Sequence, residues 1–235
     1  MSSTDLSVKF AARTRDRAAR GQQARVSRRN SRQLYRRFGK RLFDVVFSGL
    51  IILAIFPLLL IGILLAALDG HTPFFGHRRI GQQGRPFYCL KLRTMVQDAE
   101  AQLADILESD PAAAAEWTTH HKLANDPRIT AQGQFLRMTF MDELPQLWNV
   151  LRGDMSLVGP RPVTRSELAR YGSKLELVLS VRPGMTGAWQ VTGHGKTCYE
   201  DRVRMDADYA MTLSFWTDLK ILAQTVLVVL ARRGA

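Results

Sequence analysis

The sequence predicts an α+β protein, mostly helical with short strands, that is monotopic on a membrane through one re-entrant helix broken at a proline. Three observations predict this class. Residues 45–68 contain no charged residue, and Pro57 lies near the middle of this segment. Elsewhere apolar residues recur mainly at helical spacing, which indicates amphipathic helices. Short apolar runs bounded by glycine and proline separate these helices, and such runs are typical of strands.

The positive charge divides the chain into a basic N-terminal arm, a membrane segment and a folded body, at residues 1–39, 40–70 and 71–235. Residues 1–43 hold 13 Lys/Arg and two acids, a net charge of +11, whereas the remaining 20 basic and 19 acidic residues leave +1. We expect the arm to be partly disordered because it has few apolar residues to bury. A nucleic-acid-binding protein would spread basic residues over its folded body. We therefore expect no nucleic-acid partner, and instead a contact between the arm and anionic membrane lipid.

The uncharged segment is long enough to enter a membrane deeply. As a helix, it would be about 36 Å long, against a bilayer core of about 30 Å. A buried helix of a soluble protein is the alternative, and such a length without charge argues against it. Pro57 removes a helix hydrogen bond and kinks the chain. A spanning helix has most of its basic residues on one side, whereas both flanks here are basic, which favours a hairpin with both ends on one side. The flanking residues are Arg36, Arg37, Lys40 and Arg41 before the segment, and Arg78, Arg79, Arg85, Lys91 and Arg93 after it.

The folded body begins with a predicted turn and strand. Gly81 and Gly84 indicate a turn before a strand at residues 87–90. Lys91 and Arg93 follow two residues apart, so in an extended chain their side chains lie on the same face. Two cations on one face would suit a diphosphate, and ordinary solvent exposure is the alternative.

The rest of the body is predicted to be mainly helical. The last helix contains an apolar run at residues 221–231, which is too short to span a bilayer. Aromatic residues at its start and Arg232–Arg233 at its end favour a position at the membrane interface, with a core helix as an equal alternative. The two cysteines, Cys89 and Cys198, lack a metal-type spacing and fit a reduced compartment. The predicted helices cover residues 96–107, 112–123, 165–171, 174–180, 197–213 and 216–230, and a short strand covers 189–191.

Residues 134–162 are the part of the chain richest in chemically capable side chains. Arg137 precedes the adjacent acids Asp142 and Glu143, and Arg161 follows in a Gly-Pro-Arg-Pro sequence. This pattern suits an anionic substrate that is held by arginines and attacked by a carboxylate. A solvated acid pair on a helix surface is the alternative. Neighbouring residues on a helix do not face each other, so we expect the two acids to have different roles.

Several blocks in one order resemble the bacterial sugar transferases, which are small monotopic phosphoglycosyl transferases. The resemblance runs from about residue 40 to residue 230, over the blocks KRLFD, HRRIGQQGRPFYCLKLRTM, DPRIT, FLR, DELPQLWNVLRGDMSLVGPRP, RPGMTGAWQVTG and DLKIL. The family has a re-entrant helix broken at a Ser-Pro pair, but here Phe56 precedes Pro57, so the serine is absent. Where the family has an arginine near the substrate phosphate, this chain has His194, which we leave outside the predicted site.

The resemblance implies a reaction in which a sugar-1-phosphate passes from a UDP-sugar to undecaprenyl phosphate, with release of UMP. Resemblance to hexose-1-phosphate transferases of the exopolysaccharide type favours UDP-galactose or UDP-glucose. Asp142 is the implied nucleophile of a ping-pong reaction through an aspartyl-phosphosugar. Glu143, with Asp142, is the implied ligand of Mg²⁺, which would neutralise the diphosphate. Substrate phosphate would be bound by Arg137 and Arg161, and also by Lys91 and Arg93.

The same resemblance predicts the protein's place in the cell. It implies the bacterial inner (cytoplasmic) membrane, with residues 71–235 as a catalytic domain that faces the cytoplasm and rests on interfacial helices. The reaction would be the first membrane step of exopolysaccharide or glycoconjugate synthesis. The sequence leaves the oligomeric state open, including a homodimer.

Overall fold

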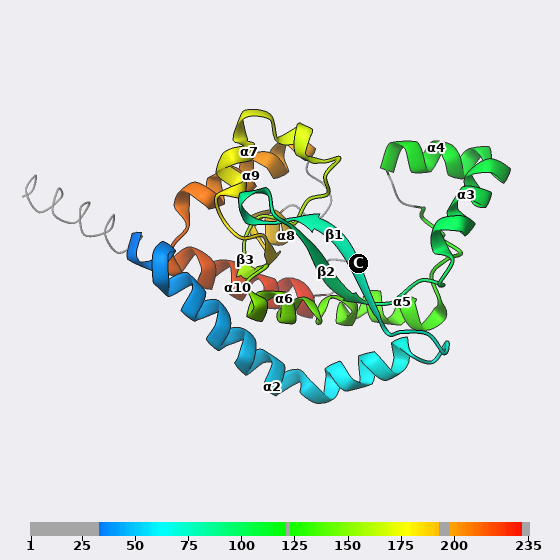
Figure 1. The fold of residues 1–235 in the computed structure, drawn as a ribbon, viewed down its shortest axis with the longest axis horizontal. Coiled ribbons are helices and arrows are strands. Elements are labelled where there is room, and N and C mark those ends of the chain that lie inside the picture. The colour runs from blue at the N-terminus through cyan, green and yellow to red at the C-terminus, as the bar shows by residue number, and fades with distance from the viewer. Residues whose placement is uncertain (1–32, 121–122, 193–197, 232–235) are drawn as a thin grey trace, which may run out of the picture.

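The computed structural model describes residues 33–120, 123–192 and 198–231, and it is mostly helical with a few short strands, as predicted. Figure 1 shows the longest helix along the lower edge of the molecule, a β-hairpin across the middle, and a pair of helices that projects from the body on the side away from residue 33. Most of the basic arm and Arg232–Arg233 lie outside the described residues.

The apolar segment forms one long helix. A π-helical turn, η1 (Tyr35–Gly39), continues into α2 (Lys40–Ala66), and Pro57 lies inside α2. The prediction of a helix broken at Pro57 is therefore corrected: the helix bends along its length but does not end (Figure 1). A proline removes one backbone hydrogen bond, and the flanking apolar residues continue the helix on both sides.

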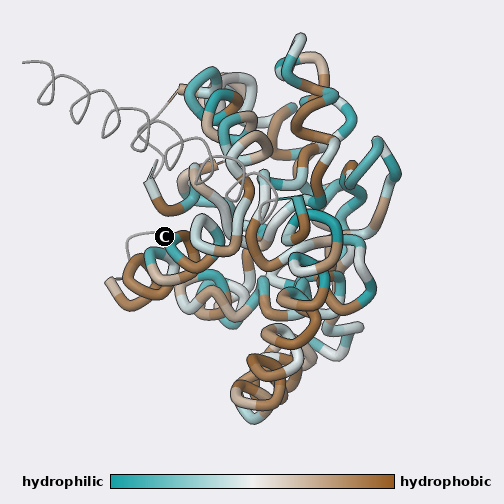
Figure 2. Tube along the Cα trace, turned by 90° about the vertical axis from the view of Figure 1, so that its left-hand side faces the viewer, coloured by the Kyte–Doolittle hydropathy of each residue, from teal (hydrophilic) through white to brown (hydrophobic). Residues whose placement is uncertain are grey.

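Length and composition make Tyr35–Ala66 a candidate membrane helix. Little of its most apolar stretch is buried within the protein. Much of the chain on this helix is brown in Figure 2, which marks hydrophobic residues. Large side chains along it are exposed, among them Leu53 and Leu64. An apolar surface of this kind needs a partner other than water, which a lipid bilayer would provide.

A buried ionic network fixes α2 to the C-terminal helix α10 (Phe215–Leu230). The Lys40 ammonium lies 2.8 Å from Asp218 and 3.3 Å from Asp44, and both carboxylates are fully buried. The Tyr35 and Tyr209 hydroxyls each donate to Asp218 at 2.7 Å. Removing one member of such a network would leave an uncompensated buried charge. The first and last blocks of the family resemblance therefore meet in space.

The predicted turn at Gly81 and Gly84 is confirmed. The antiparallel strands β1 (Phe74–Ile80) and β2 (Pro86–Leu92) flank the short 3₁₀ turn η2 (Gln82–Gly84). The register pairs Phe75 with Lys91 and His77 with Cys89. Directly paired residues of an antiparallel ladder lie on the same face, so Phe75 and His77 share the face of Lys91.

Two helices follow the hairpin, α3 (Ala99–Ser109) and α4 (Pro111–His120). The predicted helix over residues 96–107 begins three residues later than expected. Met95 instead forms a β-bridge with Ile129, the Val96 amide donates to the Arg128 carbonyl, and a turn at residues 97–98 precedes the helix. Helix α4 begins at Pro111, a residue that suits the first helical position because its missing N–H needs no partner there. The amides of the next two residues donate to the Asp110 side chain, which caps the helix.

The second sheet is parallel and holds the Gly-Pro-Arg-Pro loop. It consists of β3 (Ser156–Val158) and β4 (Gly184–Thr186). A Cβ atom at Gly159 would lie 2.5 Å from the Arg182 carbonyl oxygen, so the close approach of the segments after β3 and before β4 requires glycine there.

The predicted strand at residues 189–191 is wrong. These residues belong to the helix α8 (Ala188–Thr192), in which the Thr192 hydroxyl donates to the Ala188 carbonyl. A short apolar run does not distinguish a strand from a buried helix turn. The strand that pairs with β3 lies immediately before it in the chain.

The remaining helices surround these two sheets. The helices predicted over residues 197–213 and 216–230 are confirmed, as α9 (Tyr199–Thr212) and α10. Ile221 of α10 is buried, whereas Trp216 and Leu230 are exposed, so the helix joins the core by one face and leaves the other open. The other elements are α5 (Ala131–Met138), η3 (Met141–Glu143), α6 (Gln146–Arg152), η4 (Leu168–Lys174) and α7 (Leu175–Leu179).

Candidate active site

The acid pair lies in a tight turn between α5 and α6, not on a regular helix. Asp142 and Glu143 belong to the 3₁₀ turn η3, and Phe140 immediately before it has a left-handed backbone with φ of 57°. A bulky residue rarely adopts this conformation, and such strain is concentrated at functional sites. The side chain of the adjacent Met141 is buried and anchors the turn.

Lys91 of β2 brings the two carboxylates together. Its ammonium nitrogen lies 2.6 Å from a Glu143 oxygen and 3.5 Å from an Asp142 oxygen. Both distances are within ion-pair range, and the shorter one is a charge-assisted hydrogen bond. The two neighbouring acids therefore converge on one cation, although they point apart on a regular helix.

The surroundings push the two carboxyl pKa values in opposite directions. Burial raises the pKa of Asp142; Lys91 offsets part of this rise, and repulsion from Glu143 adds to it. Burial would raise the pKa of Glu143 as well, but Lys91, a nearby Arg161 and a hydrogen bond from Gln146 outweigh it, so this pKa is lowered. Different pKa values in one pair support different roles for the two acids.

Lys91 is held as a cation by the same contacts. Burial would lower the pKa of its ammonium, but attraction to Glu143 and Asp142 outweighs burial, and the pKa is raised. A permanently charged ammonium beside two carboxylates can exchange one of them for a phosphate oxygen when a substrate enters.

Close packing between α5 and the end of the hairpin places Arg137. A Cβ atom at Gly133 would lie 2.0 Å from the Thr94 carbonyl oxygen, so glycine allows the helix to approach the chain after β2. The Arg137 Nε then donates to the Thr94 hydroxyl at 2.9 Å. Its positive charge offsets part of the rise that burial causes in the pKa of Asp142.

Arg161 reaches the site from the loop after β3. Its guanidinium carbon lies 5.8 Å from the centre of the Trp189 ring, and its charge lowers the pKa of Glu143. The charge of Arg137 thus acts on Asp142, and that of Arg161 acts on Glu143. The structure brings three of the predicted cations together around this pair, namely Lys91, Arg137 and Arg161.

Asp206 of α9 supports the Arg161 loop and was not predicted as a site residue. Its carboxylate accepts hydrogen bonds from the Tyr171 hydroxyl at 2.9 Å and from the Arg161 backbone amide. Burial raises the pKa of Asp206 to about 6. Arg202 lies in the same cluster, 3.8 Å from Asp206 and 3.4 Å from Glu167. Arg202 and Asp206 are four residues apart on α9, but no spacing in the sequence links them to Tyr171 or to the Arg161 loop, which belong to other elements.

Arg93 is placed differently from Lys91. Its guanidinium donates to the Thr72 hydroxyl at 2.7 Å, and its backbone amide donates to the Pro73 carbonyl. Arg93 therefore fixes the stretch of chain that leads into β1. His194 lies outside the described residues.

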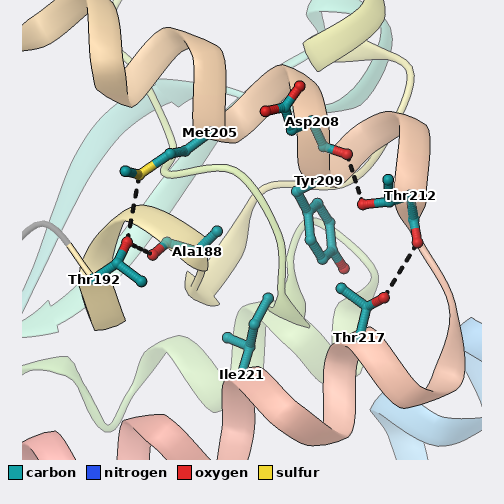
Figure 3. Close-up of a pocket in the computed structure, with 8 residues that line it drawn as sticks. All are labelled: Ala188, Thr192, Met205, Asp208, Tyr209, Thr212, Thr217 and Ile221. Atoms are coloured by element: carbon teal, nitrogen blue, oxygen red, sulfur yellow. Dashed lines mark hydrogen bonds between the residues drawn. The ribbon is translucent and has the colours of Figure 1, made fainter.

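A separate cavity of about 310 Å³ lies between α8, α9 and α10. Figure 3 shows Tyr209 and Ile221 facing it, and the hydroxyls of Thr192 and Thr212 donate to backbone carbonyls of their own helices. None of the predicted site residues lines this cavity. The acid pair lies elsewhere, against Lys91 of β2.

The donor atoms at the acid pair fit magnesium only together with a substrate. Among the residues that the structure describes, no three His, Cys, Asp or Glu side chains form a metal-binding group. Mg²⁺ is commonly held by one or two carboxylates, with substrate phosphates and water completing its shell. Asp142 and Glu143 match this smaller set of ligands.

The chain belongs to the bacterial sugar transferase family, which matches residues 35–232. It is 45% identical over 197 residues to the exopolysaccharide production protein ExoY of Sinorhizobium fredii, and the match covers 83% of this chain and 87% of that protein.

Two longer relatives carry names that specify galactose. The chain is 50% identical over 199 residues to a UDP-galactose-lipid carrier transferase of Erwinia amylovora, and 47% identical over 199 residues to an undecaprenyl-phosphate galactose phosphotransferase of Salmonella typhimurium. Each match covers 85% of this chain and 42% of the relative. The chain thus spans less than half the length of these two relatives.

Proposed function

We propose that this protein transfers a sugar-1-phosphate from a UDP-sugar to undecaprenyl phosphate and releases UMP. The observation that carries the proposal is the convergence of Asp142 and Glu143 on Lys91, with opposite pKa shifts to which the charges of Arg137 and Arg161 contribute. The relatives' names favour UDP-galactose, with UDP-glucose as the second candidate. This would be the first membrane step of exopolysaccharide or glycoconjugate synthesis.

In the first step, an Asp142 carboxylate oxygen attacks the β-phosphorus of the UDP-sugar. The bond from this phosphorus to the bridging oxygen breaks, and UMP leaves with the bond's electron pair. The sugar phosphate remains bound to Asp142 as an acyl phosphate. The raised pKa of Asp142 makes its ionised oxygen more basic, which favours attack.

In the second step, a phosphate oxygen of undecaprenyl phosphate attacks the same phosphorus. The bond to the Asp142 oxygen breaks, so the carboxylate is restored and a lipid diphosphate sugar is formed. Throughout, Lys91, Arg137 and Arg161 stabilise charge on the transferring phosphoryl group. Glu143, with Asp142, would hold Mg²⁺, which supplies further positive charge at the phosphates when bound.

A panel of sugar nucleotides tests this proposal. Membranes containing the protein should release UMP from UDP-galactose when undecaprenyl phosphate is present, and a membrane preparation containing Asp142→Asn should release only background amounts. UDP-glucose, UDP-N-acetylglucosamine and UDP-N-acetylgalactosamine are assayed in parallel at equal concentration. If none of these donors yields UMP above the Asp142→Asn background, the proposed reaction is wrong.

We propose that α2 enters the inner membrane and returns to the cytoplasmic side. The support is the bend in a helix that contains Pro57, together with basic residues before and after it (Figure 1). Both ends of the helix should then lie on the cytoplasmic side. Exposed Cys198 is replaced by serine, buried Cys89 is kept, and single cysteines are introduced at Ser31 and Ser173. Neither should react with an impermeant thiol reagent in spheroplasts, and both should react after lysis; reaction of only one before lysis contradicts the hairpin.

A further inference from the structure

An exposed aromatic residue lies directly beside the proposed phosphate site. Phe75 is paired with Lys91 across the hairpin and is 49% exposed. Paired side chains in such a ladder have Cβ atoms about 5 Å apart. A phosphate held at Lys91 would therefore place whatever is attached to it within reach of the Phe75 ring.

One ring contact and the hydrogen bonds of the preceding chain restrict Phe75. The His77 ring, on the same face, packs edge-on against it with the ring centres 6.3 Å apart. The chain before Phe75 is fixed by the two hydrogen bonds of Arg93, to Thr72 and to Pro73. An exposed aromatic ring on a rigid strand loses little conformational entropy when it binds an apolar partner.

The apolar helix packs against the residues that adjoin the ionic site. Gly62 of α2 approaches the side chains of Leu92 and Met141, the neighbours of Lys91 and Asp142. Ala66 lies in the same buried cluster. The reactive groups therefore sit next to the C-terminal half of the helix that we propose to lie in the membrane.

Exposed apolar side chains occur at both ends of the link between α2 and β1. Leu64 and Leu68 at the end of α2 are 58% and 65% exposed, and Phe74 at the start of β1 is 46% exposed. Phe74 pairs with Leu92, so it lies on the face of the hairpin opposite to Phe75 and Lys91. A cation with exposed apolar side chains nearby matches a ligand with an anionic head and an apolar chain.

We propose that Phe75 binds the first isoprene units of the lipid phosphate acceptor, an inference that rests on the proposed function. In a polyprenyl phosphate, the first isoprene carbon is bonded to the phosphate oxygen, so it lies beside any residue that flanks the bound phosphate. The nucleobase of the donor is separated from the transferred phosphoryl group by a second phosphate and a ribose. The position of Phe75 next to Lys91 therefore favours the acceptor's chain over the donor's base.

The test compares the two half-reactions in the full-length protein with Phe75→Ala. The enzyme is first incubated with UDP-galactose radiolabelled in the sugar, and undecaprenyl phosphate is then added at a series of concentrations. The variant should acquire the same amount of label as wild type. Half-maximal discharge of the label should need about tenfold more undecaprenyl phosphate, the effect of losing one buried aromatic contact. Phe75→Leu should recover part of the loss.

Tyr88→Ala is the matched control, because Tyr88 is an exposed aromatic of the same hairpin on the face opposite to Lys91. It should behave as wild type in both half-reactions. Unchanged discharge in Phe75→Ala overturns the proposal, and slower labelling with unchanged discharge assigns Phe75 to the donor instead. If wild type never acquires label, the covalent step of the proposed function fails. The Phe75 inference is then decided by the KM for undecaprenyl phosphate in steady-state UMP release, which should again rise about tenfold in the variant.

Discussion

Asp142→Asn is expected to abolish covalent labelling of the protein by a UDP-sugar. A carboxamide is a very poor nucleophile, so no acyl phosphate can form at this position. The substitution preserves the size of a side chain that is only 10% exposed, so the turn around it should remain folded. Wild type, incubated with radiolabelled UDP-galactose without undecaprenyl phosphate, should retain no more than one label per chain and lose it when the lipid is added. The variant should retain none.

Glu143→Gln is compared with Asp142→Asn, because it removes the other negative charge from the same turn. Lys91 would lose its 2.6 Å partner and be left with Asp142 at 3.5 Å. The stronger remaining pairing would lower the pKa of Asp142 and weaken its carboxylate as a nucleophile. We expect severely slowed labelling, with label still detectable at long times. If instead Glu143→Gln never labels while Asp142→Asn does, the roles of the two acids are reversed.

Absence of label in rapidly quenched wild-type protein would contradict the two-step reaction itself. The lipid phosphate would then attack the UDP-sugar directly, with both substrates bound together. UMP release that strictly requires undecaprenyl phosphate would support this one-step alternative. A burst of UMP without the lipid, equal to the amount of enzyme, would support the covalent route.

Local sequence patterns predicted the elements of this fold well where one signal dominated. Gly81 and Gly84 predicted the hairpin turn because glycine readily adopts the backbone conformations that tight turns need. The error at residues 189–191 came from the opposite situation, since three residues carry too little periodicity to separate a strand from one helix turn. The prediction of a helix broken at Pro57 was wrong, because a proline within a long apolar helix bends the helix and need not end it.

The composition of the site was predictable, but its geometry was not. Asp142, Glu143 and the two arginines all lie within residues 134–162, so the sequence alone identifies them as candidates. Lys91 lies 51 positions before Asp142 and meets it only because β2 runs beside the turn. The support of Arg161 by Asp206 depends on the packing of α9 against a loop. Such long-range contacts follow from the tertiary fold, which no spacing rule describes.

Arg137→Ala and Arg161→Ala are each expected to lower turnover by about 10²–10³-fold, the loss seen when one preorganised charge-stabilising donor is removed. The charge of Arg137 acts on Asp142 and that of Arg161 acts on Glu143, so we expect their effects to differ in kind. Loss of Arg137 should slow formation of the labelled intermediate at Asp142. Loss of Arg161 should also raise the magnesium concentration needed for half-maximal rate, because Glu143 is a proposed metal ligand.

Lysine should not replace either arginine well, because it lacks the planar fork that grips two phosphate oxygens. Arg152→Ala is the control, since the Arg152 side chain is 61% exposed on the far end of α6 and pairs with Asp154 at the surface. UMP release should be near the wild-type rate in this control, which separates a local effect from a general loss of positive charge. Wild-type turnover in Arg137→Ala or Arg161→Ala would remove that arginine from the site. Equal magnesium dependence in the two variants would show that both arginines act on the transferred phosphate alone. The proposal that Glu143 binds the metal would then lose this support.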